Sequence, residues 1–275
     1  MLSFVLNDSL TKFVSASIAA PQLIFLRGLL ASLGLLILAL TVTKLPPWRE
    51  TWCHISHKWV FIRSFLDGMA SLVYLSAMFH MPLANATAIN MSTPLLIALL
   101  SALLLGQRVS GRHWGIIGAG FVGVLLVVQP QADGFNAWGW VALAGTLFHA
   151  LRDLSVRFIP DQVPSILVTL GTAITATLMA GLWALWHPWQ TVTGFEWGLM
   201  TAAAIFLSIG YFLLIKATRM ADMTVIAPFR YMGLITAVVM GFVVWGDVPN
   251  ALAWVGMALL AAAGIAMIRT SALRT

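Results

Sequence analysis

The sequence predicts an all-α integral membrane protein with ten transmembrane helices, arranged as two inverted five-helix repeats. Three observations support this fold class: an apolar composition, apolar runs of membrane-spanning length, and a weak internal similarity. Of the 275 residues, 60% are hydrophobic and only 9% are charged. A soluble domain carries about 25% charged residues, so the composition excludes that class. An apolar stretch of about 20 residues is long enough to cross a bilayer as a helix.

We expect ten such spans, in residues 1–17, 22–42, 61–80, 83–105, 113–129, 137–156, 164–186, 196–215, 223–245 and 251–268. The first is not a cleaved signal peptide, because it lacks a basic start and contains Asn7, Asp8 and Lys12. About 17 residues is the minimum that crosses a bilayer. Either the first span is short, or the native start lies upstream of Met1.

The basic residues lie on one side of this predicted topology. If the N-terminus is inside, every Lys and Arg except Lys12, Arg27 and Arg230 falls in a cytoplasmic connection or after the last span. That distribution follows the positive-inside rule. The net charge of +6 therefore reflects topology and not nucleic-acid binding. We expect a multi-pass protein of the inner membrane, embedded in the lipid bilayer, with both termini in the cytoplasm.

The two halves of the chain resemble each other. The matching segments are 7–13 with 152–158, 74–89 with 211–226, and 106–114 with 246–254. We expect residues 1–130 and 137–270 to be the two repeats. Because each repeat has an odd number of spans, the second crosses the membrane in the opposite sense. Inverted repeats of this kind build many secondary transporters, whose substrate sites lie near the midplane between the repeats.

Two spans are interrupted at corresponding positions. Asn90 and Pro94 interrupt the fourth span, and Pro228 and Arg230 interrupt the ninth. Proline frees a backbone carbonyl one turn earlier, and such a loosened turn is tolerated where it faces a cavity. We therefore expect both helix breaks, at Pro94 and Pro228, to lie at the midplane site.

The candidate substrate-binding residues are Arg230, Tyr231, Asn90, His149, Tyr74 and Tyr211. The tyrosines supply amphipathic rings suited to a planar or aromatic ligand. A guanidinium at mid-membrane costs at least about 2.5–3.5 kcal/mol, so Arg230 needs a partner. It either meets a carboxylate, phosphate or polarised carbonyl of a cargo, or is tethered to a backbone carbonyl or to Asp8.

Asp8, Lys12 and Asp153 are further candidates for a coupling or structural role. Asp8 and Lys12 are four residues apart, so we expect them to pair on one helix face. Asp8, Asp153 and His149 are the groups that proton coupling has available, and facilitated exchange is the alternative. Arg27 is expected to extend toward the outer interface. Asp67 is expected to pair with Arg63, four residues earlier.

Cys53, His54 and His57 lie close together but have no evident fourth ligand, so we expect no metal site. No cofactor is expected either. Gly115, Ala119 and Gly123 form a face of small residues on the fifth span. Such a face permits close helix packing, either in a homodimer or within the fold.

Two long segments carry a family resemblance. They are MPLANATAINMSTPLLIALLSALLLGQRVSGRHWGIIGAGFVGVLLVVQP, residues 81–130, and MTVIAPFRYMGLITAVVMGFVVWGDVPNALAWVGMALLAAAGI, residues 223–265. Each has a helix with a mid-span proline, a glycine at the helix end, and a following helix rich in small residues. The chain resembles the EamA-type carriers of the drug/metabolite transporter superfamily, in the branch of riboflavin and S-adenosylmethionine carriers. Gln107 stands where that pattern has an acidic residue, and Asp247 keeps it.

The resemblance implies a secondary transporter, a permease or exporter of small organic metabolites that works by alternating access, with the two repeats rocking about a central cavity. We expect no enzyme, since the sequence holds no HExxH, GxSxG or Walker motif. The expected partner is a small-molecule metabolite, with no nucleic acid. The alternatives are a membrane receptor or partner protein that does not transport, and an intramembrane enzyme.

Overall fold

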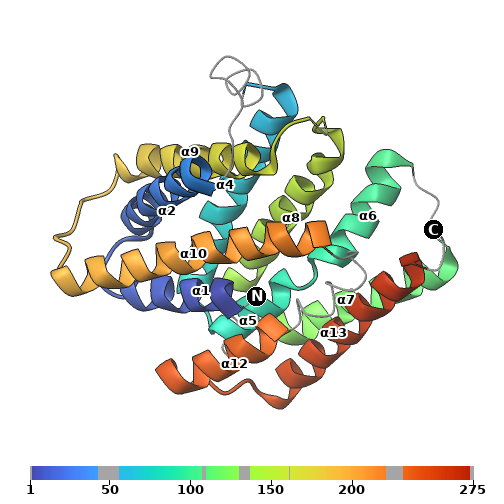
Figure 1. Ribbon diagram of the computed structural model, residues 1–275. Coiled ribbons are helices and arrows are strands. Elements are labelled where there is room, and N and C mark those ends of the chain that lie inside the picture. Colours follow the sequence, from blue (N-terminus) through green and yellow to red (C-terminus); the bar gives the residue numbers. More distant parts are fainter. Residues whose placement is uncertain are drawn as a thin grey trace.

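The computed structural model describes residues 2–42, 56–106, 110–129, 137–160, 162–220 and 232–272. Helices make up nearly all of these residues, and no strand occurs among them (Figure 1). The helices of the first half are α1 (Leu2–Val14), α2 (Ala20–Val42), α4 (Lys58–Phe79), α5 (Leu83–Asn90), α6 (Thr93–Leu105) and α7 (Gly111–Val128). Those of the second half are α8 (Trp138–Ser155), the 3-10 turn η1 (Val156–Phe158), α9 (Ser165–Ala184), α10 (Gly194–Met220), α12 (Met232–Trp245) and α13 (Ala251–Ala272).

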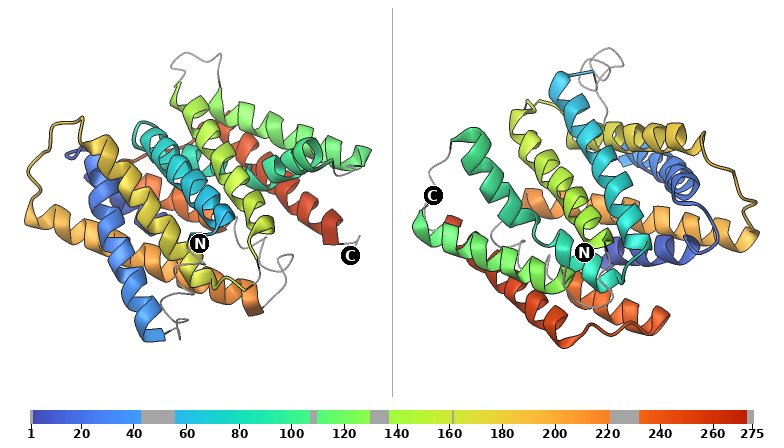
Figure 2. Two further views of the ribbon diagram at one scale, coloured as in Figure 1. Left: turned by 90° about the horizontal axis from the view of Figure 1, so that it is seen from above. Right: turned by 180° about the vertical axis from the view of Figure 1, so that it is seen from behind.

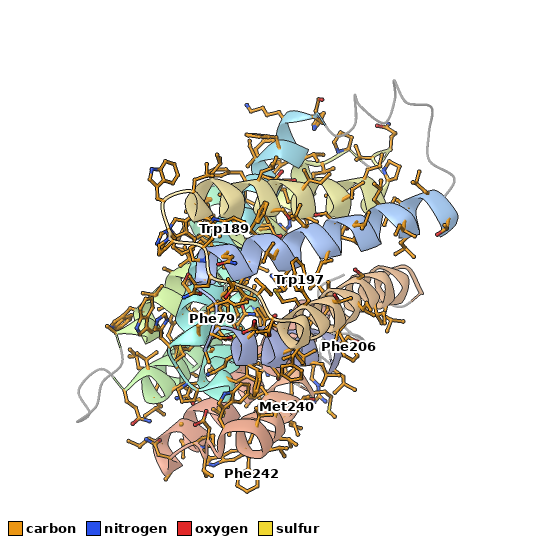
Figure 3. All side chains as sticks on the ribbon, turned by 90° about the vertical axis from the view of Figure 1, so that its left-hand side faces the viewer. Phe79, Trp189, Trp197, Phe206, Met240 and Phe242 are labelled. Atoms are coloured by element: carbon orange, nitrogen blue, oxygen red, sulfur yellow. The ribbon has the colours of Figure 1, made fainter. Side chains whose placement is uncertain are left out.

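These helices correspond to the ten predicted spans, with α5 and α6 forming one broken span. Five stretches of the described chain are long and apolar enough to cross a membrane, namely Ala20–Thr41, Lys58–Phe79, Leu83–Leu105, Gly111–Val128 and Ile166–Ala184. Many large apolar side chains point outward, as Phe242 does in Figure 3. Apolar groups on the surface suit lipid rather than water. The fold class, an all-helical membrane protein of ten spans, is confirmed.

The helices pack mainly across the two halves. α2 lies against α9, and α7 lies against α13, so equivalent helices meet each other (Figure 1 and Figure 2). The remaining contacts come in matched sets: α4 packs on α8 and α9, as α10 packs on α1 and α2. The broken span α5–α6 packs on α8, as α12 packs on α1. This exchange of partners is the pattern that a pseudo-two-fold axis between two repeats produces.

Small residues allow the equivalent helices to approach closely. A Cβ atom on Gly123 would lie 2.9 Å from the carbonyl oxygen of Gly256, and one on Gly256 would lie 2.7 Å from that of Gly123. The small face of α7 at Gly123 is therefore used within the fold, against α13. Gly115, on the same helix, has no neighbouring atom within 4 Å of its Cβ position.

Glycines end two equivalent helices. Gly106 follows α6 with φ 62°, and Gly246 follows α12 with φ 71°. Residues with a side chain rarely adopt this left-handed conformation, which is a common way to stop a helix. Gly106 and Gly246 are matched by the internal similarity of the sequence, so the two repeats use the same helix stop.

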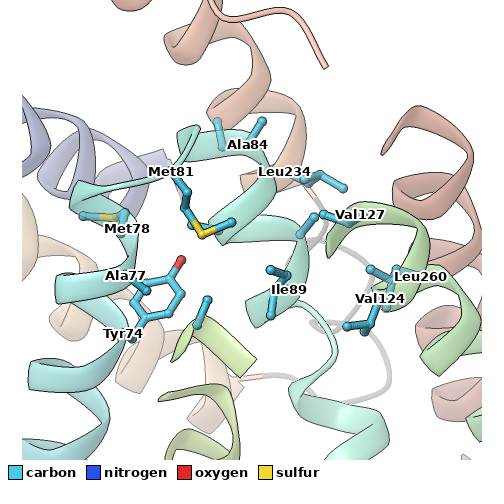
Figure 4. Packing of buried hydrophobic residues seen from close by; sticks show 14 of the residues in the cluster. Tyr74, Ala77, Met78, Met81, Ala84, Ile89, Val124, Val127, Leu234 and Leu260 are labelled. Carbon is cyan, nitrogen blue, oxygen red and sulfur yellow. The ribbon is translucent and has the colours of Figure 1, made fainter. Parts of the chain in front are cut away.

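The largest hydrophobic core takes most of its buried residues from α4, α5, α7 and α13, and others from α1, α2, α6, α8, α9 and α12. Figure 4 shows part of it, with Ile89 of α5 between Tyr74 of α4 and Val124 of α7.

The bundle also has two distinct ends. At one end, which we call the Lys12 end, α1, α4, α7, α9 and α12 finish. The connection between α9 and α10 belongs to that end and lies on the left of Figure 1. The last turn of α13 lies at the other end, on the right of the same view.

Candidate substrate-binding site

Polar side chains from three helices meet where the fourth span is broken. Asn90 is the last residue of α5, and the chain resumes as α6 at Thr93, with Pro94 in the first turn. The side-chain hydroxyl of Thr93 donates to the carbonyl oxygen of Asn90, at 2.6 Å. This bond satisfies a backbone acceptor that the break leaves without its helical partner. The break therefore presents the amide of Asn90 to the neighbouring helices.

Asn90 contacts His149 of α8. Nδ1 of His149 lies 3.0 Å from Oδ1 of Asn90. An amide oxygen only accepts hydrogen bonds, so the imidazole donates through Nδ1. The ring of Tyr74, on α4, lies 5.6 Å from the ring of His149, centroid to centroid, and its phenol shares a hydrogen bond with the side chain of Thr87. We call Tyr74, Thr87, Asn90 and His149 the central polar cluster.

A second group of polar residues lies between α1 and α2. Nδ2 of Asn7 donates to Oδ1 of Asp8 at 2.9 Å, and Nη1 of Arg27 donates to Oδ1 of Asn7 at 3.0 Å. The amide of Asn7 therefore bridges a carboxylate and a guanidinium. Asp8 also interacts electrostatically with Arg27 and with Tyr74, which places this group beside the central polar cluster.

Two predictions about these helices are wrong. Asp8 and Lys12 do not pair, although both lie in the described part of the chain. Lys12 instead donates to the backbone carbonyl of Met81, because that carbonyl lies at the end of the bundle where α1 finishes. Arg27 does not extend to an interface. Its side chain is only 8% exposed, because Asn7 and Asp8 supply its partners inside the bundle.

Asp153 lies away from the central cluster, in the last turn of α8. Nη2 of Arg152 lies 2.9 Å from its Oδ1, and the same guanidinium forms an ion pair with Asp67 of α4. The predicted pairing of Asp67 with Arg63 is wrong as the main contact. Arg63 is close enough for an electrostatic interaction with Asp67, but its Nη1 donates to Oγ1 of Thr172 on α9, at 2.7 Å.

Several predicted residues cannot be placed. Pro228, Arg230 and Tyr231 lie outside the described residues, as do Cys53 and His54. Tyr211 lies in α10, but its side chain is not described. Of the six candidate substrate-binding residues, the structure brings together Tyr74, Asn90 and His149. In the described chain, no three potential metal ligands among His, Cys, Asp and Glu lie close enough to hold an ion.

Sequence reasoning missed Asn7 and Thr87, and gave Arg27 an interfacial role. A signal for Asn7 was present, because two adjacent polar residues, Asn7 and Asp8, inside a short apolar span need partners. The contact between Arg152 and Asp67 had no local signal, because 85 positions separate the two residues.

The fold and the site together define a class of protein. A ten-span bundle built from two repeats, with polar side chains converging at a broken helix between them, is the architecture of a secondary transporter. The sequence model of the EamA-like transporter family matches residues 1–129 and again residues 136–270. The chain belongs to the EamA-like transporter family, and it is a membrane transporter.

Three relatives with different named cargoes have similar sequence identity to this chain. It is 26% identical to the pseudopaline exporter of Pseudomonas aeruginosa, over 98% of this chain and 93% of the relative. It is 26% identical to an S-adenosylmethionine uptake transporter of Rickettsia bellii, over 91% and 84%. It is 24% identical to a riboflavin transporter of Vibrio cholerae, over 94% and 87%. A crystal structure of a 22% identical protein superposes with a TM-score of 0.61, covering 99% of this chain and 96% of the other.

Proposed function

We propose that this protein carries a small organic metabolite across the inner membrane by alternating access, as a permease or exporter. The observation that carries the proposal is the contact among Tyr74, Asn90 and His149, at a helix break where α4, α5 and α8 meet. These groups supply an aromatic face together with hydrogen-bond donors and acceptors. Such a set suits a planar or zwitterionic cargo that must leave its hydration shell in water.

The names of the relatives support a transporter and not an intramembrane enzyme or a receptor that does not transport. Their named cargoes are pseudopaline, S-adenosylmethionine and riboflavin, all small organic molecules. The remaining predicted residues, Arg230, Tyr231 and Tyr211, stay candidates for the same site. Asp8 interacts electrostatically with both Arg27 and Tyr74, so groups of both signs lie next to the central polar cluster, which favours a cargo carrying charges of both signs. The proposed driving force is proton coupling through Asp8, Asp153 or His149, and the alternative is facilitated exchange.

The proposed orientation places both termini in the cytoplasm. Basic residues gather at the end of the bundle opposite the Lys12 end, where α4 begins and α8 and α13 finish. The Lys12 end carries Glu196 at the start of α10 and Asp247 between α12 and α13. Under the positive-inside rule, the basic end faces the cytoplasm.

The moving bodies are proposed to contain helices from both repeats. The family resemblance implies that the two repeats, residues 1–130 and 137–270, rock against each other. Because α1 packs on α10 and α12, and α8 packs on α4 and on α5–α6, the helices of one repeat are held by those of the other. A homodimer stays a prediction, and the exposed part of α7 around Gly115 is the small-residue surface still available for it.

The test is transport into proteoliposomes of radiolabelled S-adenosylmethionine, riboflavin and pseudopaline, with His149→Gln as the first variant. We expect one of the three to enter, and its initial rate to fall about tenfold or more in His149→Gln. That is the loss expected when a buried polar contact to the cargo is removed. His187→Gln is the matched control, because His187 follows α9 at the Lys12 end and lies against Trp183. An equal rate in His149→Gln and its parent would remove His149 from the site.

A further inference from the structure

Lys12 joins three elements at one end of the bundle. Its Nζ donates to the carbonyl oxygen of Met81, in the turn between α4 and α5. The same Nζ lies 5.2 Å from the ring centroid of Trp245, the last residue of α12, and interacts electrostatically with Asp247. A cation over an indole ring is attracted by the charge distribution of the ring. One side chain of α1 thus binds elements from both halves of the chain.

Other contacts at this end tie equivalent helices together more firmly. The side chain of Gln22, at the start of α2, exchanges two hydrogen bonds of 2.8 Å with the backbone of Gln190, in the α9–α10 connection. The side chains of Gln129 and Asn250 exchange bonds of 2.7 and 2.9 Å between α7 and α13. Figure 3 looks at this end of the bundle. Reciprocal hydrogen bonds therefore fix α2 to the α9–α10 connection, and the end of α7 to the start of α13.

The Lys12 contacts differ from these two clamps. They consist of one hydrogen bond, one cation–π contact and a longer-range attraction to Asp247, and all of them depend on a single side chain. One opening that keeps both clamps separates α1 from α12 and from the α4–α5 turn. That separation breaks every Lys12 contact described above.

The central polar cluster lies directly behind these contacts. Lys12 is one turn beyond Asp8 on α1, and Asp8 interacts electrostatically with Tyr74. Residues four apart lie on the same face of a helix. The hydroxyl of Tyr74 points toward Met81, whose carbonyl accepts the Lys12 bond (Figure 4). A path from the Lys12 end to the cluster would pass between α1 and the α4–α5 turn.

We propose that Lys12 is a latch that closes the Lys12 end of the bundle over the central polar cluster. When its ammonium leaves Met81 and Trp245, the end of α1 separates from α12 and from the α4–α5 turn, and the cluster opens to that side of the membrane. This inference rests on the proposed carrier function for its purpose, while access to the central polar cluster is measurable without any cargo.

The experiment measures access to the cluster and needs no cargo. In a Cys53→Ser background, Thr87→Cys places one thiol in the central polar cluster, and a membrane-impermeant maleimide is added to right-side-out or inside-out vesicles. Lys12→Met should raise the labelling rate about tenfold from one side only, the change expected on losing one charge-assisted hydrogen bond. Trp245→Leu should raise it about threefold from the same side, because it removes only the cation–π contact. Lys12→Arg should keep the rate near that of the parent.

Arg157→Met is the matched control. Arg157 is the residue of the second repeat that corresponds to Lys12, and it lies exposed in η1 at the opposite end. This variant should leave labelling from the Lys12 side unchanged. Unchanged rates from both sides in Lys12→Met and Trp245→Leu would overturn the latch, even if proteoliposomes transport a cargo. If Lys12→Met does not fold, Trp245→Leu decides alone. Raised labelling without any transport would retain the latch and reject the carrier.

Discussion

Replacing Arg152 with methionine should lower the free energy of unfolding by about 3–5 kcal/mol, the loss usual when one partner of a buried ion pair is removed. The side chain of Asp67 is only 6% exposed and that of Arg152 only 18%, so neither charge recovers much hydration when left alone. Arg63 stands near Asp67 but is already bonded to Thr172, which limits its use as a substitute. Intrinsic tryptophan fluorescence during thermal unfolding in detergent measures the change.

Two variants separate this effect from a general loss of charge. Arg157→Met removes an exposed guanidinium five residues further along and should change stability by less than about 0.5 kcal/mol. The double variant Asp67→Leu with Arg152→Met should regain most of the loss, since an apolar pair avoids the unpaired buried charge. A single Arg152→Met variant as stable as its parent would mean that water reaches Asp67.

Gly145→Ala should impair both folding and transport, because it pushes α8 away from α4 at the site itself. A Cβ on Gly145 would lie 2.8 Å from N, Cα and Cβ of Tyr74. Backbone atoms cannot rotate away as a flexible side chain can, so the two helices must separate. Overpacking of this kind costs about 1–3 kcal/mol. The shift would also move Tyr74 relative to His149, which lies one turn after Gly145 on the same helix.

Gly118→Ala on α7 is the control for helix composition. No atom lies within 4 Å of the Cβ position of Gly118, so the methyl group meets no neighbour. Alanine favours a helix over glycine by about 0.5–1 kcal/mol, so this variant should be as stable as the parent or slightly more stable. Fluorescence melting gives the stability, and proteoliposome uptake corrected for the amount of folded protein gives the rate. Full transport by Gly145→Ala would show that Tyr74 need not keep its position.

The spans were predictable because apolar runs of membrane length are a strong local signal. The break at Asn90 was predictable too, because two residues four positions apart, the polar Asn90 and the proline Pro94, interrupt an apolar run. Neither feature needs knowledge of a distant contact. The sequence placed Asn90 and His149 in one site, because polar residues in spans are expected to face one another. It did not predict their direct contact.

Pairings between helices were less predictable. The spacing of Asp8 and Lys12 permits an ion pair, but spacing within one helix does not reveal competitors on other helices. Lys12 donates to the carbonyl oxygen of Met81, in the turn before Pro82. Asp8 accepts a hydrogen bond from Asn7 and interacts electrostatically with Arg27. The same limitation applies to Asp67, whose main partner, Arg152, comes from the second half of the chain.

The exchange of partners between the halves bears on how the protein acquires its stability. The chain reads as two successive copies, but α1, α2 and α4 each bury their faces mainly against α8, α9 and α10. A five-span half made alone would expose those faces, including the glycine contact of α7 with α13. Neither copy is therefore expected to hold its native form during synthesis until the other has entered the bilayer. The cooperative unit of folding is the whole chain, and a fragment ending in the connection after α7 should be a substrate for membrane proteases.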